Sequence, residues 1–206
     1  MLLWAGLFLL LLGVVTFAFD RRAAHWVHAR IPRVWHRRLA RTTDWAKGSH
    51  WLNLSVASLL LADSVLWLWG KPAWFHAVAE TSLAFLACLA VASGVLHTIK
   101  FLAGRRRPRD ELEHDLYGWR PFRLDTQHDS FPSGHAMTIL CVAVIACGIA
   151  PFLWPVWFGL ALYLALTRAF MNAHFFSDVF IGAGIGLLAS REVVLYFYPT
   201  LAQPWF

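Results

Sequence analysis

Residues 2–19 read LLWAGLFLLLLGVVTFAF, an uninterrupted run without a charged side chain. Such a run is typical of a helix that crosses the hydrocarbon core of a bilayer, which requires about 20 apolar residues. No basic segment precedes it and no A-x-A cleavage site follows it, so we expect a retained helix rather than a signal peptide. Further apolar runs occupy residues 51–69, 77–99, 134–150, 152–167 and 175–198. The sequence therefore predicts an all-α, polytopic membrane protein with six transmembrane helices.

The composition supports this prediction. Hydrophobic residues make up 59% of the 206 residues, charged residues make up 15%, and the mean hydropathy is +0.54. A soluble domain has about 25% charged residues, so a soluble fold of this chain would expose a large apolar surface to water. The length suits six spans with their connections, and we expect a single membrane-embedded domain over residues 1–206. Cys88, Cys141 and Cys147 lie in apolar runs and lack the spacing of a disulfide framework or a zinc site.

Residues 20–50 follow the first apolar run and combine basic with aromatic side chains. Within this segment, Ile31, Val34, Trp35 and Leu39 have the spacing of one apolar helical stripe, and arginines lie beside tryptophans. This combination is typical of an amphipathic helix in the headgroup layer of a membrane. We expect an interfacial amphipathic segment here, and a solvated loop is the alternative.

Six crossings place alternate polar connections on the same side of the membrane. One side then holds residues 20–50, 100–133 and 168–174, together with all of the 18 lysines and arginines except Lys71 and Arg191. The net charge of +6 suits anionic lipids, phosphorylated substrates or nucleic acid, but the chain contains no recognisable soluble module for nucleic acid. We expect the long polar connection between the third and fourth spans to form an active-site loop.

Two basic residues near the end of the third predicted span are candidates for anion binding. Lys100 and Arg107 are seven residues apart, so a continuing helix brings them to nearly the same side, and Pro108 helps to end that helix. The two cations could then face one anion. The alternative interpretation is a basic cluster at a helix end, formed by Arg105 to Arg107, that stops membrane insertion.

A second motif, Pro132-Ser133-Gly134-His135, directly precedes the fourth span. A serine followed by glycine at a helix start offers a hydroxyl and free backbone N–H groups, and the helix dipole there favours an anion. His135 would lie beside that anion. The alternative is that Ser133 is an ordinary N-cap followed by an interfacial histidine.

A third motif joins the fifth and sixth spans and contains Arg168, His174 and Asp178. His174 and Asp178 are four residues apart, so on a helix they share a face and the carboxylate could accept the imidazole N–H. The other ring nitrogen would then be free to act as a nucleophile. An aspartate just inside a membrane helix is costly and normally serves function or a partner, although a purely structural pair is the alternative.

These three motifs together resemble the type 2 phosphatidic acid phosphatase (PAP2) superfamily. The family pattern KxxxxxxRP, PSGH and SRxxxxxHxxxD is similar to KFLAGRRRP, PSGH and TRAFMNAHFFSD, which lie within residues 100–178 here. Thr167 stands where serine is usual and retains a hydroxyl. Three ordered motifs on one membrane face are far more specific than any one of them.

The resemblance implies a role for each motif residue. His174 would attack phosphorus to form a phosphohistidine, Asp178 would orient it, and His135 would protonate the leaving oxygen. The phosphoryl oxygens would be held by Lys100, Arg107, Ser133, Gly134 and Arg168. No metal or other cofactor is expected, and we interpret the acidic residues 110–115 (Asp110, Glu111, Glu113 and Asp115) as a solvated, charge-balancing segment rather than a Mg²⁺ site.

The motifs and the resemblance predict a phosphatase that hydrolyses a phosphate monoester or diphosphate of a membrane lipid. Candidate substrates are undecaprenyl diphosphate, phosphatidylglycerol phosphate, phosphatidic acid and lipid A. The motifs act on the phosphoryl group, so they do not define the rest of the lipid. The sequence does not define the oligomeric state either. A transporter or flippase that binds a phosphorylated lipid without cleaving it is the alternative. The expected partners are the lipid and the bilayer. Asp63, within the second span, could be a hydrogen-bond partner, a substrate-path residue or part of a polar helix face.

The orientation in the membrane involves a conflict. The excess of basic residues on the side of the three motifs favours the cytoplasm. Bacterial members of the resembling family usually work at the outer face of the inner membrane. We therefore expect a bacterial inner-membrane protein whose active site faces the periplasm.

Overall fold

The computed structural model describes residues 1–69, 73–122 and 129–206. Within these ranges the chain forms helices, short 3-10 turns and one isolated bridge between Arg105 and Trp119, with no strand, so the all-α prediction is confirmed. The α-helices are α1 (Leu2–Thr16), α2 (Asp20–Arg30), α3 (Arg33–Thr43), α4 (Gly48–Trp69), α5 (Ala73–Ala103), α6 (Pro108–His114), α7 (Gly134–Ile149), α8 (Trp154–Phe170) and α9 (Phe176–Phe197). The 3-10 turns are η1 (Asp44–Ala46), η2 (Pro151–Leu153) and η3 (Pro199–Leu201).

The helices α1, α4, α5, α7, α8 and α9 coincide with the six predicted apolar runs. Three segments are long and apolar enough to span a membrane: Trp74–Ala103, Pro151–Phe170 and Phe176–Phe197. α1 and α2 form a fourth candidate as a pair bent by 84°. α7 has 16 residues, fewer than the about 20 that a bilayer requires. The described residues therefore support three or four spans, and the number six stays a prediction.

The outer faces of the long helices are apolar. Trp4, Phe8, Leu61 and Trp67 are between 62% and 84% exposed. Large apolar side chains that are this exposed over several helices would be unfavourable in water and are suited to lipid. The surface therefore agrees with the candidate spans in indicating a membrane protein.

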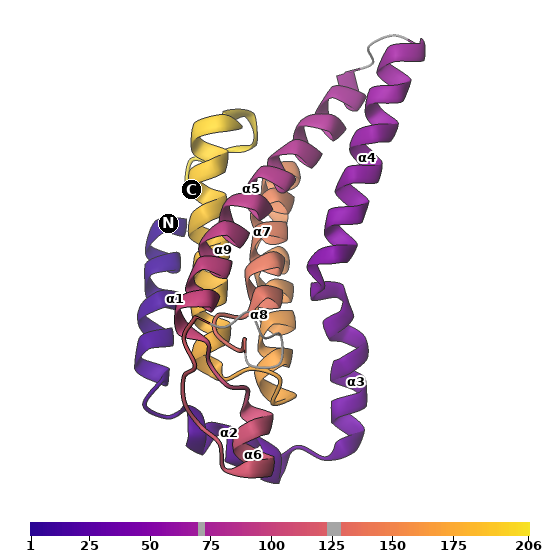
Figure 1. Cartoon of the computed structure of the whole chain (residues 1–206). Coiled ribbons are helices and arrows are strands. Elements are labelled where there is room, and N and C mark those ends of the chain that lie inside the picture. The colour runs from indigo at the N-terminus through magenta and orange to yellow at the C-terminus, as the bar shows by residue number, and fades with distance from the viewer. Residues whose placement is uncertain (70–72, 123–128) are drawn as a thin grey trace.

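The basic segment 20–50 divides into two differently placed helices. α2 turns away from α1 by 84° and lies across the end of the bundle, as an interfacial helix would (Figure 1). α3 instead packs beside α8, where the hydroxyls of Thr43 and Thr167 are 3.0 Å apart. The prediction of one interfacial segment therefore agrees with the placement of α2 better than with that of α3.

The central helix α9 packs against α1, α5, α7 and α8. Two of its glycines face α7, because a Cβ atom at Gly182 or Gly186 would overlap the carbonyl oxygen of Ser133 or Met137. This close approach brings the start of α7 against the first turn of α9. The Ser133 N–H consequently donates a hydrogen bond of 2.9 Å to the carbonyl of Asp178.

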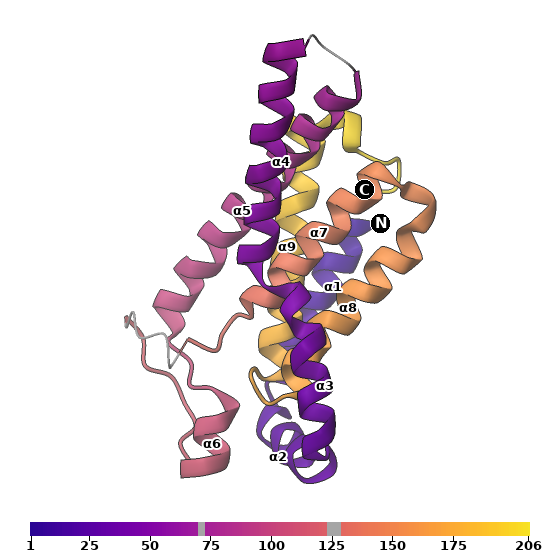
Figure 2. The ribbon, with the colours of Figure 1, turned by 90° about the vertical axis from the view of Figure 1, so that its right-hand side faces the viewer.

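The helix α6 follows α5 in the chain and lies beyond the bundle, at the same end as α2 (Figure 2). Glu111 of α6 has a fully buried side chain, and its Oε1 accepts a hydrogen bond of 2.6 Å from Nε of Arg21 and lies 3.3 Å from Nε2 of His25. The interpretation of the acidic residues 110–115 as a solvated segment is therefore wrong for Glu111. Its partners lie on α2, which is distant in the sequence.

Candidate active site

One cavity of about 460 Å³ gathers most of the predicted site residues at the end of the bundle where α5 ends and α7 begins. Six of the eight line it: Lys100, Arg107, Gly134, His135, Arg168 and His174. The other two, Ser133 and Asp178, are fully buried. The three motifs, which are separated in the sequence, therefore form one site.

Three cations line this cavity, with one carboxylate among the described lining residues. Lys100 Nζ donates a hydrogen bond of 2.6 Å to the backbone carbonyl of Asp129 and lies 3.6 Å from its Oδ2. A terminal nitrogen of Arg107 donates to Asp129 Oδ1 at 3.2 Å. The Nε atoms of Arg107 and Arg168 are buried and have no partner among the described residues. Unpaired N–H donors and a positive balance of charge suit a phosphate group.

Ser133 is the residue before the first turn of α7, and its side chain makes no capping hydrogen bond. Its hydroxyl is buried and has no partner in the described part of the chain. The alternative interpretation, an ordinary N-cap, therefore does not hold. The N–H of Ser133 itself is bonded to the carbonyl of Asp178, and the expectation of free N–H groups at the start of α7 stays a prediction. The hydroxyl is what Ser133 can offer to a phosphoryl oxygen.

His174 lies in the turn before α9, and its side chain is 4% exposed. Its Nδ1 is 2.8 Å from the backbone carbonyl of Ser130, and since a carbonyl only accepts, Nδ1 carries the hydrogen. Burial lowers the pKa of His174 well below its ordinary value, and the charges of Arg168 and Lys100 lower it further. The imidazole is therefore neutral, with its lone pair on Nε2.

Asp178 does not bond to the imidazole directly. Its carboxylate lies 3.9 Å from Nδ1 of His174, which is too far for a hydrogen bond. Oδ2 accepts from the Ser130 hydroxyl at 2.5 Å and from a backbone N–H of the turn at 2.8 Å, while Oδ1 accepts from Arg105 at 2.6 Å. The expectation of a direct bond is therefore corrected. A spacing of four residues pairs side chains only within one helix, but α9 begins at Phe176, so His174 lies outside it.

Ser130 connects the two motif residues, and sequence reasoning missed it. Its carbonyl accepts the His174 N–H, and its hydroxyl donates to Asp178. The side chain is fully buried, so this geometry is shielded from water. Ser130 lies two residues before the second motif and belongs to none of the three, so no pattern in the sequence distinguished it.

Arg105 is the second residue that sequence reasoning missed, because the sequence shows it as part of a basic cluster. Its side chain is 1% exposed and donates to the carboxylates of Asp178 at 2.6 Å and Asp20 at 2.8 Å. It also donates to the hydroxyls of Ser177 and Tyr117. Burial lowers the pKa of Arg105, but the charges of Asp178 and Asp20 outweigh that effect and raise the pKa above its ordinary value.

Aromatic rings enclose this guanidinium. Its central carbon lies 4.1 Å from the ring centre of Phe175, 4.9 Å from that of Phe17 and 5.2 Å from that of Trp119. A signal for this cluster was present in the sequence. Asp20 and Asp178 each lie at the end of an apolar run, where an unpaired carboxylate is costly and a buried cation is required.

The remaining polar candidates have the following positions. His135 lies in the first turn of α7 and lines the same cavity as His174. His97 of α5 also lines this cavity and is a second candidate for the proton donor. His128, which lies between α6 and α7 in the sequence, is outside the described residues. Asp63 is exposed on α4 and does not line the cavity.

Within the described ranges, no group of three or more His, Cys, Asp or Glu side chains is arranged to hold a metal ion. The positive charge of the cavity comes from Lys100, Arg107 and Arg168 instead. Such side chains can stabilise phosphoryl transfer in the way that metal ions do elsewhere. Independence from metals stays a prediction.

A family model for the PAP2 superfamily matches residues 81–201, which is more than half of the chain and includes all three motifs. The chain belongs to the PAP2 superfamily. Thr167, which replaces the usual serine of the third PAP2 motif, is buried and donates a hydrogen bond of 2.6 Å to the carbonyl of Leu164. The hydroxyl at this position thus contacts both its own helix α8 and Thr43 of α3.

Two curated relatives of this PAP2 chain are lipid A 1-phosphatases. The protein from Rhizobium johnstonii is 30% identical over 115 residues, which cover 55% of this chain and 47% of the relative. The protein from Rhizobium etli is 31% identical over 104 residues, which cover 50% of this chain and 45% of the relative. The chain therefore spans about half the length of the curated relatives it matches.

Two solved structures share the fold of this PAP2 chain. LpxE from Aquifex aeolicus aligns with a TM-score of 0.61 at 16% identity, covering 86% of this chain and 96% of LpxE. A transmembrane PAP2-type phosphatidylglycerolphosphate phosphatase from Bacillus subtilis aligns with a TM-score of 0.59 at 19% identity, covering 92% of each chain. These similarities show a common helical architecture.

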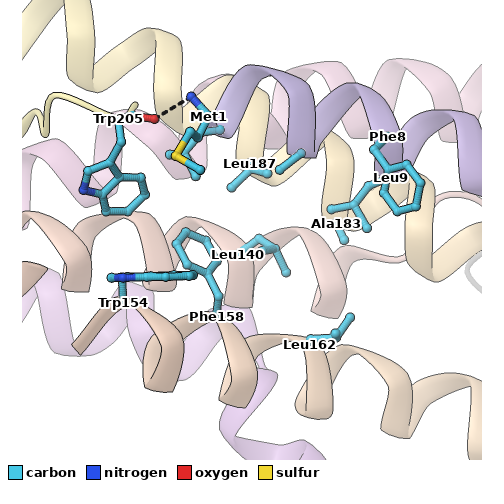
Figure 3. Close-up of a pocket in the computed structure, with 12 residues that line it drawn as sticks. Met1, Phe8, Leu9, Leu140, Trp154, Phe158, Leu162, Ala183, Leu187 and Trp205 are labelled. Carbon is cyan, nitrogen blue, oxygen red and sulfur yellow. Dashed lines mark hydrogen bonds between the residues drawn. The ribbon is translucent and has the colours of Figure 1, made fainter. Parts of the chain in front are cut away.

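A second cavity, of about 530 Å³, lies near the chain termini (Figure 3). Its walls are apolar and include Trp154 and Phe158 of α8 and Leu187 of α9. The hydrogen bond drawn there joins the Met1 amine to the carbonyl of Trp205 at 2.6 Å. Because the described lining residues bring no charged side chain, the cavity of the PAP2 motifs is the one equipped for phosphoryl chemistry.

Proposed function

We propose that this chain is a membrane phosphatase that hydrolyses a phosphate monoester or diphosphate of a membrane lipid through a phosphohistidine intermediate. The observation that carries the proposal is the state of His174, a neutral imidazole bonded through Nδ1 to Ser130 in a cavity with three cations. An imidazole with an oriented lone pair is a competent nucleophile. The surrounding positive charge would stabilise the phosphoryl group during transfer.

The cavity lining favours a lipid over a water-soluble phosphate. Leu52 of α4, Leu89 and Leu96 of α5 and Met137 of α7 line the same cavity as the cations. A lipid phosphate combines an anionic group with apolar chains, so it matches both parts of this lining. The apolar outer faces of the helices support a substrate that comes from the surrounding bilayer.

The proposed reaction has two steps. In the first, Nε2 of His174 attacks phosphorus, a P–N bond forms, and the bond from phosphorus to the lipid oxygen breaks as His135 gives that oxygen a proton. Burial and the charge of Arg168 lower the pKa of His135 to about 4, so His135 takes up this proton together with the anionic phosphate, whose charge raises the pKa again. In the second, water loses a proton to His135 and attacks phosphorus, the P–N bond breaks, and inorganic phosphate leaves. Throughout, the developing charge on the phosphoryl oxygens is neutralised by Lys100, Arg107 and Arg168.

We rank the candidate substrates by the names of the related proteins. Lipid A phosphorylated at the 1-position and phosphatidylglycerol phosphate come first, because related proteins are named for them. Undecaprenyl diphosphate and phosphatidic acid follow. The test is phosphate release from a panel of these purified lipids by the protein in detergent. Release from at least one lipid is expected, and binding of every lipid without release would favour the transporter or flippase.

The metal-independent mechanism has its own test. Activity should persist in EDTA and be inhibited by orthovanadate, which can adopt the five-coordinate geometry of the phosphoryl transition state. Loss of activity on chelation, restored by Mg²⁺, would show that a different mechanism operates.

We also propose a location in the bacterial inner membrane with the catalytic cavity facing the periplasm. Six crossings would then place both termini in the cytoplasm. A reporter fused after Phe206 should show a cytoplasmic signal, and an extracytoplasmic signal would place the cavity on the opposite side.

A further inference from the structure

A third cavity, of about 400 Å³, lies between α2, α3, α6 and the turn from α8 to α9. Arg107 lines this cavity and the catalytic cavity, so the two adjoin at its side chain. The catalytic cavity also contains the leucines that suit a lipid. The third cavity has a different lining, in which Arg107 is the one described residue to which the motifs assign a role.

Two buried N–H donors in this lining lack a partner among the described residues, Nε of Arg107 and Nδ2 of Asn172. Asn172 is 8% exposed, and its backbone is in the left-handed region with φ 52°. Asparagine and glycine tolerate this conformation better than other residues, and non-glycine residues in it are concentrated at functional sites. A buried amide without a partner is rare in folded proteins and indicates a ligand that accepts hydrogen bonds.

The charge of the lining favours an anion as that ligand. Arg109 of α6 adds a second guanidinium, and His28 and His36 add imidazoles from α2 and α3. Glu113 is the one carboxylate among the described lining residues. Guanidinium and amide N–H groups in such a set are typical ligands of phosphate oxygens.

The two products of lipid phosphate hydrolysis have opposite solubilities. The dephosphorylated lipid stays with the bilayer and the leucines, whereas inorganic phosphate must reach water. We propose that the third cavity is a second subsite for a phosphate oxyanion, reached from the catalytic cavity past Arg107. The inference rests on the proposed function for the origin of its ligand, which is either the released phosphate or the second phosphate of a doubly phosphorylated lipid headgroup.

Direct binding of inorganic phosphate to the full chain in detergent tests the subsite. The wild type should bind two phosphates per chain, and a double variant with Arg109→Gln and Asn172→Gly should bind one. Glycine retains the left-handed backbone at position 172 while removing the amide. Arg30→Gln on α2 removes the same charge from an exposed position outside this cavity and should leave both phosphates bound.

Steady-state kinetics of the double variant distinguish the two sources of phosphate. A rise of about tenfold in the inhibition constant of inorganic phosphate, with unchanged KM for singly and doubly phosphorylated lipids, would show that the subsite receives the released product. A rise in KM for doubly phosphorylated lipid alone would show that it takes the second headgroup phosphate. The proposal would be overturned if the inhibition constant of phosphate and the KM values for singly and doubly phosphorylated lipids were all unchanged.

The binding experiment also separates this proposal from the proposed function. If the wild type binds two inorganic phosphates but hydrolyses no lipid phosphate, the catalytic proposal fails and the subsite stands. If lipid phosphates are hydrolysed while the wild type binds a single phosphate, the subsite is overturned and the catalytic proposal stands. Retention of both phosphates by the double variant would also overturn the subsite.

Discussion

Arg105 and Arg107 belong to one basic cluster, but the structure gives them opposite surroundings. Arg105 is 1% exposed, bonded to two carboxylates and two hydroxyls, and enclosed by aromatic rings. The Arg107 side chain is 29% exposed, contacts one carboxylate, that of Asp129, and retains a buried Nε without a partner in the described ranges. The Nε of Arg105 also lacks a partner in the described ranges, but both of its terminal nitrogens are bonded within the protein and its surroundings are closed. Arg105 therefore positions its neighbours, whereas Arg107 lines the catalytic cavity and can bind substrate.

The surroundings of Arg105 and those of Arg107 meet at His174, the candidate nucleophile. On one side, Arg105 holds Asp178, which accepts the hydroxyl of Ser130, whose carbonyl in turn fixes the proton on His174. On the other side, the cavity with Arg107 is where a phosphate would lie. Substitutions on the first side should therefore affect stability and orientation, and those on the second should affect substrate turnover alone.

The largest effect on stability is expected for Arg105→Met. This change leaves the carboxylates of Asp20 and Asp178 buried without a cation, which costs about 3–5 kcal/mol of unfolding free energy. Arg106→Met is the matched control, because Arg106 makes one ion pair within the described residues, at 4.0 Å with Asp110, and the variant should lose at most about 1 kcal/mol. Thermal unfolding in detergent measures both. Equal losses for the two variants would remove the distinction between the arginines.

Arg107→Gln should show the reverse pattern. Removing one of the cations that stabilise the phosphoryl group should lower kcat/KM by about 100-fold to 1,000-fold. The unfolding temperature should stay unchanged or rise slightly, since the lining also contains Lys100 and Arg168, which carry like charge. A stability loss as large as that of Arg105→Met would show that Arg107 is structural as well.

Ser130→Ala is expected to have an intermediate effect on both properties. It removes the hydroxyl that bonds to Asp178 but leaves the carbonyl that bonds to His174, so stability should fall by about 1 kcal/mol and kcat by about tenfold. Ser190→Ala is the control, because the Ser190 hydroxyl is buried without a partner among the described residues and its loss should not destabilise the fold. If Ser130→Ala has wild-type kcat, the link between His174 and Asp178 has no role in catalysis.

An effect that is absent at neutral pH is expected in the pH dependence of stability. The pKa of His174 is lowered in the folded state, so the unfolded state binds a proton first as the pH falls through the ordinary value of 6.5. Wild-type stability should therefore decrease below that pH by up to about 1.4 kcal/mol per pH unit from this residue. His174→Gln should lack this contribution. Parallel stability curves for the two proteins between pH 7.5 and 5.5 would contradict a neutral, buried His174.

The sequence predicted the long helices and the convergence of the three motifs, because both depend on local properties. Each apolar run formed a helix, and each motif lies where a run begins or ends. The contacts around Arg105 and Ser130 could not be predicted in this way. Ser130 bonds to a residue 48 positions away and Arg105 to one 85 positions away, and such pairings depend on how helices pack.

A local rule also failed at one point. The spacing of His174 and Asp178 predicts a shared helical face, but the turn before α9 keeps His174 out of the helix and places Asp178 in its first turn. Helix boundaries of one or two residues therefore decided which group bonds to the imidazole, and hydrophobic periodicity does not define boundaries that closely.

The most direct test of the account is whether phosphate becomes attached to His174 during turnover. Brief reaction with a lipid carrying a radiolabelled phosphate, followed by alkaline quenching, preserves a phosphoramidate bond. We predict that the wild type and Arg30→Gln carry an acid-labile, base-stable label on His174, and that His174→Ala remains folded, carries no label and releases no phosphate. Label on another residue, or turnover by His174→Ala above about a tenth of the wild-type rate, would contradict the account.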